Sequence, residues 1–157
     1  MNGIAPAPKK NSPVKIFPLA EEHLDAVLAI EKRAFTEPWR REDFQRLTDN
    51  PEAISLAALD EGRVVGYSCC WTVIETAELG NLAVEPEFQG RGVARALLEA
   101  TIKACRKKMI AMLFLEVRCS NRRAIELYER YGFVRIGLRR GYYTHPVEDA
   151  LIMKLSL

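Results

Sequence analysis

The stretch from Asn81 to Ala100, NLAVEPEFQGRGVARALLEA, combines residues suited to binding an anion. An apolar run gives way to the segment Gln89 to Ala94, QGRGVA, and a helical pattern follows. The first turn of a helix exposes unpaired backbone N–H groups, and the helix macrodipole adds roughly half a positive charge there. Glycines at positions 90 and 92 would let a phosphate oxygen reach those groups without meeting a Cβ atom. The stretch therefore favours a phosphate ligand, and a pyrophosphate fits it best.

Two arginines of this stretch, Arg91 and Arg95, add positive charge to the turn. The spacing is not a dinucleotide-binding fingerprint, because G-x-G-x-x-G would need glycine or alanine at position 95. It is not a P-loop either, because no Gly-Lys-Ser or Gly-Lys-Thr follows. An ordinary glycine-containing turn between a strand and a helix explains the same residues, so the stretch alone leaves both interpretations open.

Two further residues are of types that move protons. Glu116 lies in the apolar segment LFLEV, where burial favours a carboxylate that accepts a proton. An ion pair with Arg118 or another basic group explains this residue equally well. Tyr128 precedes Tyr131 by three residues in ELYERYGF, so both rings share one helical face, and packing against the core accounts for them.

These side chains need a scaffold, and hydrophobic periodicity predicts alternating strands and helices. The expected strands are 14–19, 53–59, 63–74, 76–85, 111–117, 133–143 and 147–155, and the expected helices are 20–35, 39–47, 93–109 and 120–132. Turn residues at 60–62 and 75–76 separate the second, third and fourth strands, which predicts antiparallel succession. Ser120 is expected as the N-cap of the last helix and Gly132 as its C′ residue.

Composition sets outer limits on what the chain does. With 157 residues and 48% hydrophobic content, it is expected to form one domain, spanning 14–157, that buries a sizeable core. Residues 1–13 contain three prolines and two lysines and are expected to be a flexible tail. A net charge of +2 gives no support for a nucleic-acid partner, although basic pairs occur at 122–123 and 139–140.

The remaining features indicate a cytoplasmic protein without a metal. The four cysteines have no C-x-x-C spacing, which is typical of a reducing compartment. The sequence has neither an apolar run of about 18 residues nor the apolar core of a signal peptide, so no membrane segment is expected. His23 and His145 are too scattered for a metal site, and no acidic cluster has ligand spacing.

The segment LAVEPEFQGRGVARALLE resembles the acetyl-coenzyme A signature of the GNAT superfamily of N-acetyltransferases, Arg/Gln-x-x-Gly-x-Gly/Ala, with Gln89, Gly92 and Ala94 at the signature positions. LEVRCSNRRAIELYERYGF is similar to the second half of that fold, and with RRGYYTHPVEDALIMKL it is closest to the ribosomal-protein-alanine N-acetyltransferases. The resemblance implies an α/β (α+β) fold whose mixed, mostly antiparallel sheet of about six to seven strands is flanked by about four helices. Ala94 stands where many members carry glycine, but it still offers its backbone N–H.

The resemblance also implies roles for individual residues. Glu116 would be the general base, and Tyr128 the acid that protonates the leaving thiolate. A β-bulge would turn the backbone of Leu82, Ala83 and Val84 toward the pantetheine arm, with the Val84 N–H polarising the thioester. The other residues implied to bind acetyl-CoA belong to the glycine-rich turn and the start of the last helix: Gln89, Gly90, Arg91, Gly92, Val93, Ala94, Arg95 and Asn121. Helix capping is the alternative role for Asn121.

The acceptor would lie between RAFTEPWRREDF and the terminal hairpin RRGYYTHP, with Trp39, Tyr142 and Tyr143 as candidate walls. Ordinary packing of these rings is the alternative. An α-amino group has a pKa of about 7.7–8.0 against about 10.4 for lysine, so its deprotonation near neutral pH costs less. The expected activity is transfer from acetyl-CoA to the N-terminal alanine of a ribosomal protein, by a monomer.

Two alternatives to this activity stay open. One is an acetyltransferase that acts on a lysine side chain or a small-molecule amine. The other is a non-catalytic module that binds acyl-CoA or a ribosomal surface through its basic pairs.

Overall fold

The computed structural model describes residues 13–157, so the expected tail lies, apart from residue 13, outside the described residues. Seven strands form one sheet in the order β1-β2-β3-β4-β5-β7-β6. The strands are β1 (Lys15–Pro18), β2 (Ile54–Asp60), β3 (Arg63–Val73), β4 (Thr76–Val84), β5 (Met112–Arg118), β6 (Val134–Thr144) and β7 (Val147–Ser156). The helices are α1 (Leu24–Ala34), α2 (Arg41–Thr48), α3 (Val93–Lys107) and α4 (Arg122–Arg130), with 3-10 turns at Glu21–His23 and Pro86–Phe88.

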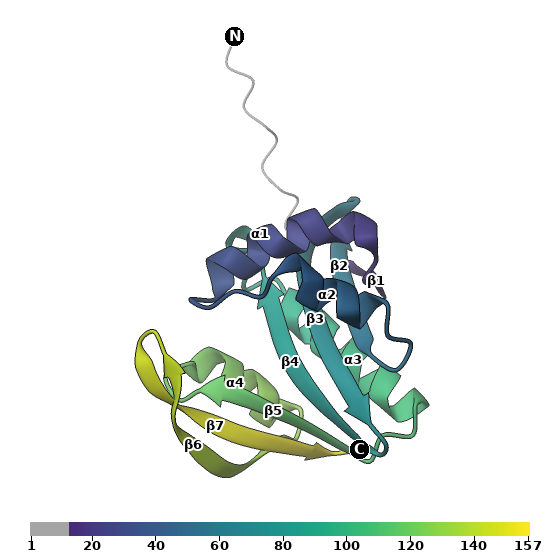
Figure 1. Ribbon diagram of the computed structural model, residues 1–157. Helices are drawn as coiled ribbons and strands as arrows, with labels where there is room; N and C mark the ends of the chain where they lie inside the picture. The colour runs from purple at the N-terminus through teal and green to yellow at the C-terminus, as the bar shows by residue number, and fades with distance from the viewer. Residues whose placement is uncertain (1–12) are drawn as a thin grey trace.

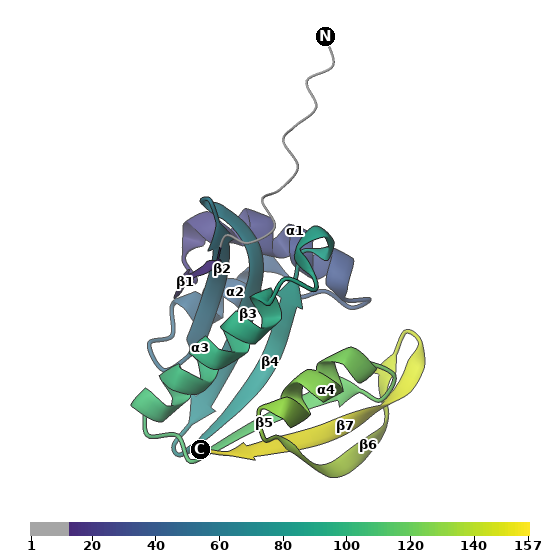
Figure 2. The ribbon, with the colours of Figure 1, turned by 180° about the vertical axis from the view of Figure 1, so that it is seen from behind.

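Helices cover both faces of the sheet. α1 and α2 lie on one face (Figure 1), and α3 and α4 lie on the other (Figure 2). α3 packs across β2, β3 and β4 through Leu97, Leu98 and Ile102, which are buried because apolar residues recur at helical spacing along it. No helix within residues 13–157 is both long and apolar enough to cross a membrane.

One β-bulge and one short ladder shape the middle of the sheet. In the β3–β4 pair, Cys69 lies opposite Asn81 but Cys70 lies opposite Leu79, so Gly80 is the extra residue of a bulge. A Cβ atom on Gly80 would lie 2.3 Å from the Trp71 ring, so a side chain at position 80 would displace that ring.

β4 and β5 pair in parallel only over Thr76–Leu79 and Met112–Leu115. Beyond this ladder the two strands diverge, as Figure 1 shows. We call the gap between residues 80–84 of β4 and residues 116–118 of β5 the fork. The bulge at Gly80 therefore stands where the fork begins, directly before the segment in which a bulge was expected.

The mixed, mostly antiparallel sheet of seven strands and its four helices confirm the expected fold class. The helix expected from Trp39 begins instead at Arg41, because Arg40 has an extended backbone (φ −89°, ψ 165°) and acts as the N-cap, with its N–H donating to the Asp43 carboxylate at 2.9 Å. The prediction that Ser120 is the N-cap of α4 is wrong. Asn121 caps α4 by accepting from the Ala124 N–H at 3.2 Å.

Candidate active site

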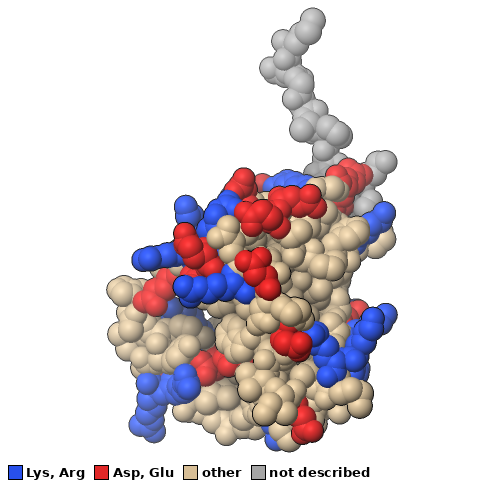
Figure 3. Space-filling view, turned by 45° about the vertical axis from the view of Figure 1, so that its right-hand side comes forward, with Lys and Arg blue, Asp and Glu red and all other residues tan. Residues whose placement is uncertain are grey.

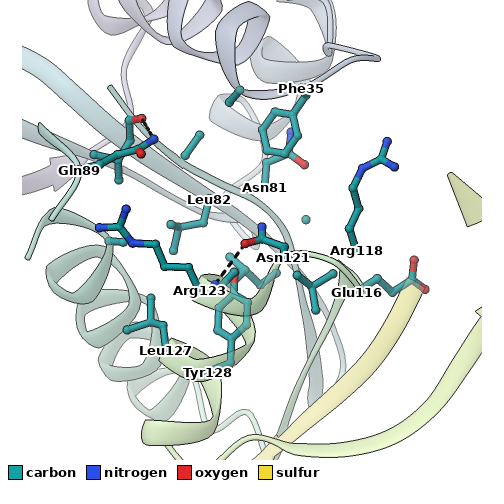
Figure 4. Close-up of a pocket in the computed structure, with 18 of the residues that line it drawn as sticks. Phe35, Asn81, Leu82, Gln89, Glu116, Arg118, Asn121, Arg123, Leu127 and Tyr128 are labelled. Carbon is teal, nitrogen blue, oxygen red and sulfur yellow. Dashed lines mark hydrogen bonds between the residues drawn. The ribbon is translucent and has the colours of Figure 1, made fainter. Parts of the chain in front are cut away.

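The fork opens into a cavity of about 1220 Å³ that crosses the sheet. Its walls come from the α1–α2 connection, β4, the turn before α3, the end of β5, α4 and β6. In Figure 4, Gln89 and Arg123 lie at one end, and Glu116 and Arg118 lie at the other. Leu82, Asn121 and Tyr128 lie between the two ends, and all seven residues line the cavity. One continuous space thus connects the glycine-rich turn with the two candidate proton-transfer groups.

The glycine-rich turn has the backbone that an anion site requires. Gly90 and Gly92 have φ angles of 76° and 82°, in the left-handed region that glycine adopts without steric cost. Among the described residues, the first N–H of α3 to bond back along the chain is that of Ala96, to the Gly92 carbonyl at 3.0 Å. The N–H groups that precede it at the helix N-terminus are left for a ligand. Gly90, Gly92 and the first three residues of α3, 93–95, line the cavity.

The arginines around this turn are arranged differently from the expectation. Arg95 lines the cavity, and its Nε donates to Glu99 and to the Tyr131 hydroxyl, both at 3.0 Å. Arg91 does not line the cavity and instead places its guanidinium 4.9 Å from the centre of the Phe88 ring. Arg123 of α4 faces the turn.

Arg123 was missed as a site residue because the sequence marks it only as half of a basic pair. Its Nη2 lies 3.4 Å from the position of a Cβ atom built on Gly90. The available signal was its place in the first turn of a helix that Asn121 caps. Asn121 also lines the cavity, so capping and ligand contact are compatible roles for it.

The backbone of Val84 points into the fork. The Glu85 N–H donates to the Val65 carbonyl at 2.8 Å across the β3–β4 ladder. This bond makes Gly66 and Val84, which are opposite each other in the register, a non-hydrogen-bonded pair. The N–H and C=O of Val84 therefore point away from β3, toward the side from which β5 has diverged.

The same alternation sets the orientation of the neighbouring residues of β4. Leu82 has the orientation of Val84, whereas Ala83 forms a hydrogen-bonded pair with Tyr67. Gln89 Nε2 lies 3.4 Å from the Val84 carbonyl oxygen and donates to it, so that the N–H of Val84 is the group left for a ligand. Of the three residues expected to present their backbones to the pantetheine arm, only Leu82 and Val84 face the fork. The backbone of Ala83 faces β3 instead.

Glu116 lies on β5 at the end of the cavity away from the glycine-rich turn. Its side chain is 17% exposed, and Oε1 lies 3.2 Å from Nε of Arg139. Arg118 is not its partner, because that guanidinium pairs with Glu148 at 3.3 Å and lies 4.2 Å from the centre of the Tyr143 ring. The carboxylate is therefore partly buried, borders the cavity and is paired with a cation from β6.

The structure separates the two tyrosines that sequence spacing leaves equivalent. Tyr128 is buried on α4, packs against Phe133 with 5.5 Å between ring centroids, and lines the cavity. Tyr131 is not among the lining residues, and its hydroxyl donates to Glu99. Burial, with a smaller effect of Tyr143, raises the pKa of Tyr128 to about 12, so its hydroxyl stays protonated near neutral pH.

Aromatic side chains form another part of the cavity wall. The centroid of the Trp39 ring lies 5.4 Å from that of Phe44 and 6.1 Å from that of Trp71, so the ring packs against the core. Trp39 also borders the cavity. Tyr142 and Tyr143 meet edge to face at 5.0 Å, and both line the cavity. The structure thus brings all three expected wall residues to one space.

Sequence reasoning also missed Glu31, which lines the cavity although its side chain is 0% exposed. The signal was its position four residues after Val27, on the apolar face of α1. Phe35, which belongs to the segment expected beside the acceptor, borders the cavity as well. Asn81 also borders it and was not named as a site residue from the sequence.

Neither the distribution of surface charge nor the metal-ligating side chains of the described residues point to a further ligand. Acidic and basic side chains are interspersed over the face seen in Figure 3. Within residues 13–157, no group of three or more His, Cys, Asp or Glu side chains is placed to hold a metal ion.

Comparisons with known proteins agree with this architecture. The family model described as the acetyltransferase (GNAT) family matches residues 24–133. The chain is 38% identical over 144 residues to the ribosomal protein bS18-alanine N-acetyltransferase of Escherichia coli (strain K12), covering 90% of this chain and 97% of that protein.

Two solved structures resemble the whole described domain. The crystal structure of the ribosomal-protein-S18-alanine N-acetyltransferase from Escherichia coli aligns with a TM-score of 0.84 and 37% identity, covering 91% of this chain and 93% of that one. The crystal structure of Ard1 from Thermoplasma volcanium aligns with a TM-score of 0.86 and 25% identity over 93% of this chain and 99% of that one. The family model spans the bulge, the glycine-rich turn and both proton-transfer candidates, and the chain therefore belongs to the GNAT family of acetyltransferases.

Proposed function

We propose that the protein transfers the acetyl group of acetyl-CoA to the N-terminal α-amino group of a protein, with the N-terminal alanine of a ribosomal protein as its acceptor. The names of the relatives, alanine N-acetyltransferases of ribosomal protein bS18, support this acceptor. The observation that carries the proposal is the Val84 N–H, which points into a cavity between an anion-binding turn and Glu116. The proposal takes the protein to act as a monomer in the cytoplasm.

The residues at the first end of the cavity suit the donor. Acetyl-CoA supplies an activated acetyl group as a thioester. The free N–H groups of Gly92 and the first turn of α3, with Arg95 and Arg123, hold its diphosphate. The backbone groups of Leu82 and Val84 and the side chain of Asn121 hold the pantetheine arm.

The residues at the second end carry out the proton transfers. Glu116 accepts a proton, through water, from the incoming ammonium group. Near neutral pH this step costs only about 1 kcal/mol for an α-amine, and several times more for lysine. The neutral nitrogen attacks the thioester carbonyl carbon, and the Val84 N–H stabilises the negative charge that develops on its oxygen. As the C–S bond breaks, the Tyr128 hydroxyl gives its proton to the departing sulfur, and the second proton of the nitrogen returns to Tyr128 through water.

The proposal is tested with three acceptors and acetyl-CoA, followed by the mass of the products. These are a peptide with a free N-terminal alanine and one internal lysine, the same peptide with a blocked N-terminus, and a polyamine mixture. Acetylation of the free peptide alone is expected, with Glu116→Gln and Tyr128→Phe both strongly impaired. Modification of the blocked peptide or the polyamines, with the free alanine untouched, would reject the acceptor. No turnover, together with acetyl-CoA binding, would favour a non-catalytic module.

A further inference from the structure

A buried carboxylate joins three elements around the cavity. Oε1 of Glu31, in the last turn of α1, accepts from the Trp39 N–H at 2.9 Å and from Asn81 Nδ2 at 3.0 Å. Oε2 accepts from the Tyr67 hydroxyl and lies 3.2 Å from the same Asn81 nitrogen. The α1–α2 connection, β3 and β4 thus each supply one donor to a single side chain.

Packing alone does not explain a carboxylate at this position. None of the ion pairs within residues 13–157 includes Glu31, so its hydrogen-bond partners are all neutral groups. Burial raises its pKa, and the bonds from Trp39, Tyr67 and Asn81 offset only part of that effect. An apolar side chain of similar size would avoid the desolvation cost, so the carboxylate is explained by the groups that it holds in place.

Two of those groups, Trp39 and Asn81, line the cavity where the fork begins. Asn81 directly follows the bulge residue Gly80, where β4 turns away from β5. Trp39 precedes α2, and its ring would lie 3.2 Å from a Cβ atom on Gly80. Glu31 therefore sets the distance between the aromatic wall and the start of the fork.

We propose that Glu31 is a positioning residue for the acceptor, which holds Trp39 and Asn81 in register without touching either substrate. This role rests on the proposed function, because it takes Trp39 as a wall of the acceptor site. The glycine-rich turn lies at the other end of the cavity, so loss of the Glu31 contacts should leave donor binding intact. The third donor, Tyr67, points from the core and provides a matched control.

Steady-state kinetics with a peptide bearing an N-terminal alanine test this role. Glu31→Gln keeps the shape but replaces one acceptor oxygen by an NH₂ group, which opposes the donors. Because misplacement by about 1 Å of groups that position a substrate can cost up to about 100-fold, we expect a rise of about 10-fold or more in the peptide KM, with the acetyl-CoA KM within about twofold. Tyr67→Phe removes a donor but leaves Trp39 and Asn81 held. It should lower Tm while the peptide KM stays within about twofold of wild type.

Three results would overturn the role. They are an unchanged peptide KM in Glu31→Gln, an equal rise in both KM values, or a Tyr67→Phe variant that raises the peptide KM as much as Glu31→Gln does. If Glu31→Gln does not fold, Asn81→Ala breaks the same link from β4 and should give the same peptide-specific rise. Absence of transfer by the wild-type protein would reject the proposed function and this role with it. Transfer without the KM split would reject the role alone.

Discussion

Replacing Gly92 by alanine should weaken acetyl-CoA binding far more than it weakens the fold. Gly92 has a φ angle of 82°, a conformation that costs a residue with a Cβ atom about 1–2 kcal/mol. No heavy atom of the protein lies within 4 Å of an ideal Cβ at this position, so backbone strain is the whole expected cost to folding. The new methyl group would occupy the space where the diphosphate meets the helix N-terminus. Loss of two charge-assisted hydrogen bonds, at about 1.5–3 kcal/mol each, predicts an increase of about 100-fold or more in Kd.

Gly62 offers a matched control for this substitution. Its φ angle is 83°, no heavy atom lies within 4 Å of its ideal Cβ, and it lies in the β2–β3 turn away from the cavity. Gly62→Ala should therefore lose the same about 1–2 kcal/mol, a fall of roughly 2–8 °C in Tm, and bind acetyl-CoA as the wild type does. Calorimetric titration and thermal melts measure both quantities. Equal affinities in the two variants would refute the assignment of the diphosphate to this turn.

Three further predictions concern single side chains. Tyr128→Phe keeps the ring that packs on Phe133 but removes the proton donor, so kcat should fall by about 100- to 10,000-fold while Tm hardly changes. A kcat within a few-fold of the wild-type value would exclude the acid role. Glu116→Gln should lower kcat/KM by about 100-fold near neutral pH. The difference in kcat/KM from wild type should become smaller above about pH 9, where the α-amine is already neutral. A difference that stays constant across the pH profile would contradict the base role. Hydrogen bonds from Ser120 hold the pKa of Glu148 below its ordinary 4.5. The stability that Glu148 adds over Glu148→Gln is thus present above pH 4.5 and is lost as the pH falls through the lowered pKa; melting curves from about pH 7 to about pH 3 should converge, and divergence would contradict this sign.

Local patterns predicted those parts of the molecule that local physics determines. The apolar spacing of residues 93–109 predicted α3, whose Leu97 and Leu98 are fully buried against the sheet. The glycines at 90 and 92 predicted a turn between a strand and a helix, and in the structure both adopt the left-handed backbone that few other residues adopt. Gly132, with a φ of 92° after α4, confirms its predicted C′ role for the same reason.

Contacts between distant segments were out of reach of such patterns. Glu31 and Asn81 are 50 positions apart, and only the packing of α1 against β4 brings them together. The sequence spacing of Tyr128 and Tyr131 does not tell which hydroxyl enters the cavity, because that depends on how α4 rotates over the sheet. The prediction of Ser120 as the N-cap of α4 failed for a similar reason. Its N–H donates to Glu148, 28 residues away, at 2.6 Å.

The fork has a consequence for how the protein avoids association with other chains. Two strands that part within a sheet leave two facing rows of unpaired backbone groups, and such edges commonly recruit a strand from another molecule. Here each row is short, at residues 80–84 and 116–118. An incoming strand would meet few backbone N–H and C=O groups in register with its own. A thin molecule with widely spaced amide groups could form hydrogen bonds with both rows. The short unpaired stretches thus offer little edge for the addition of a strand, and they remain accessible to a ligand.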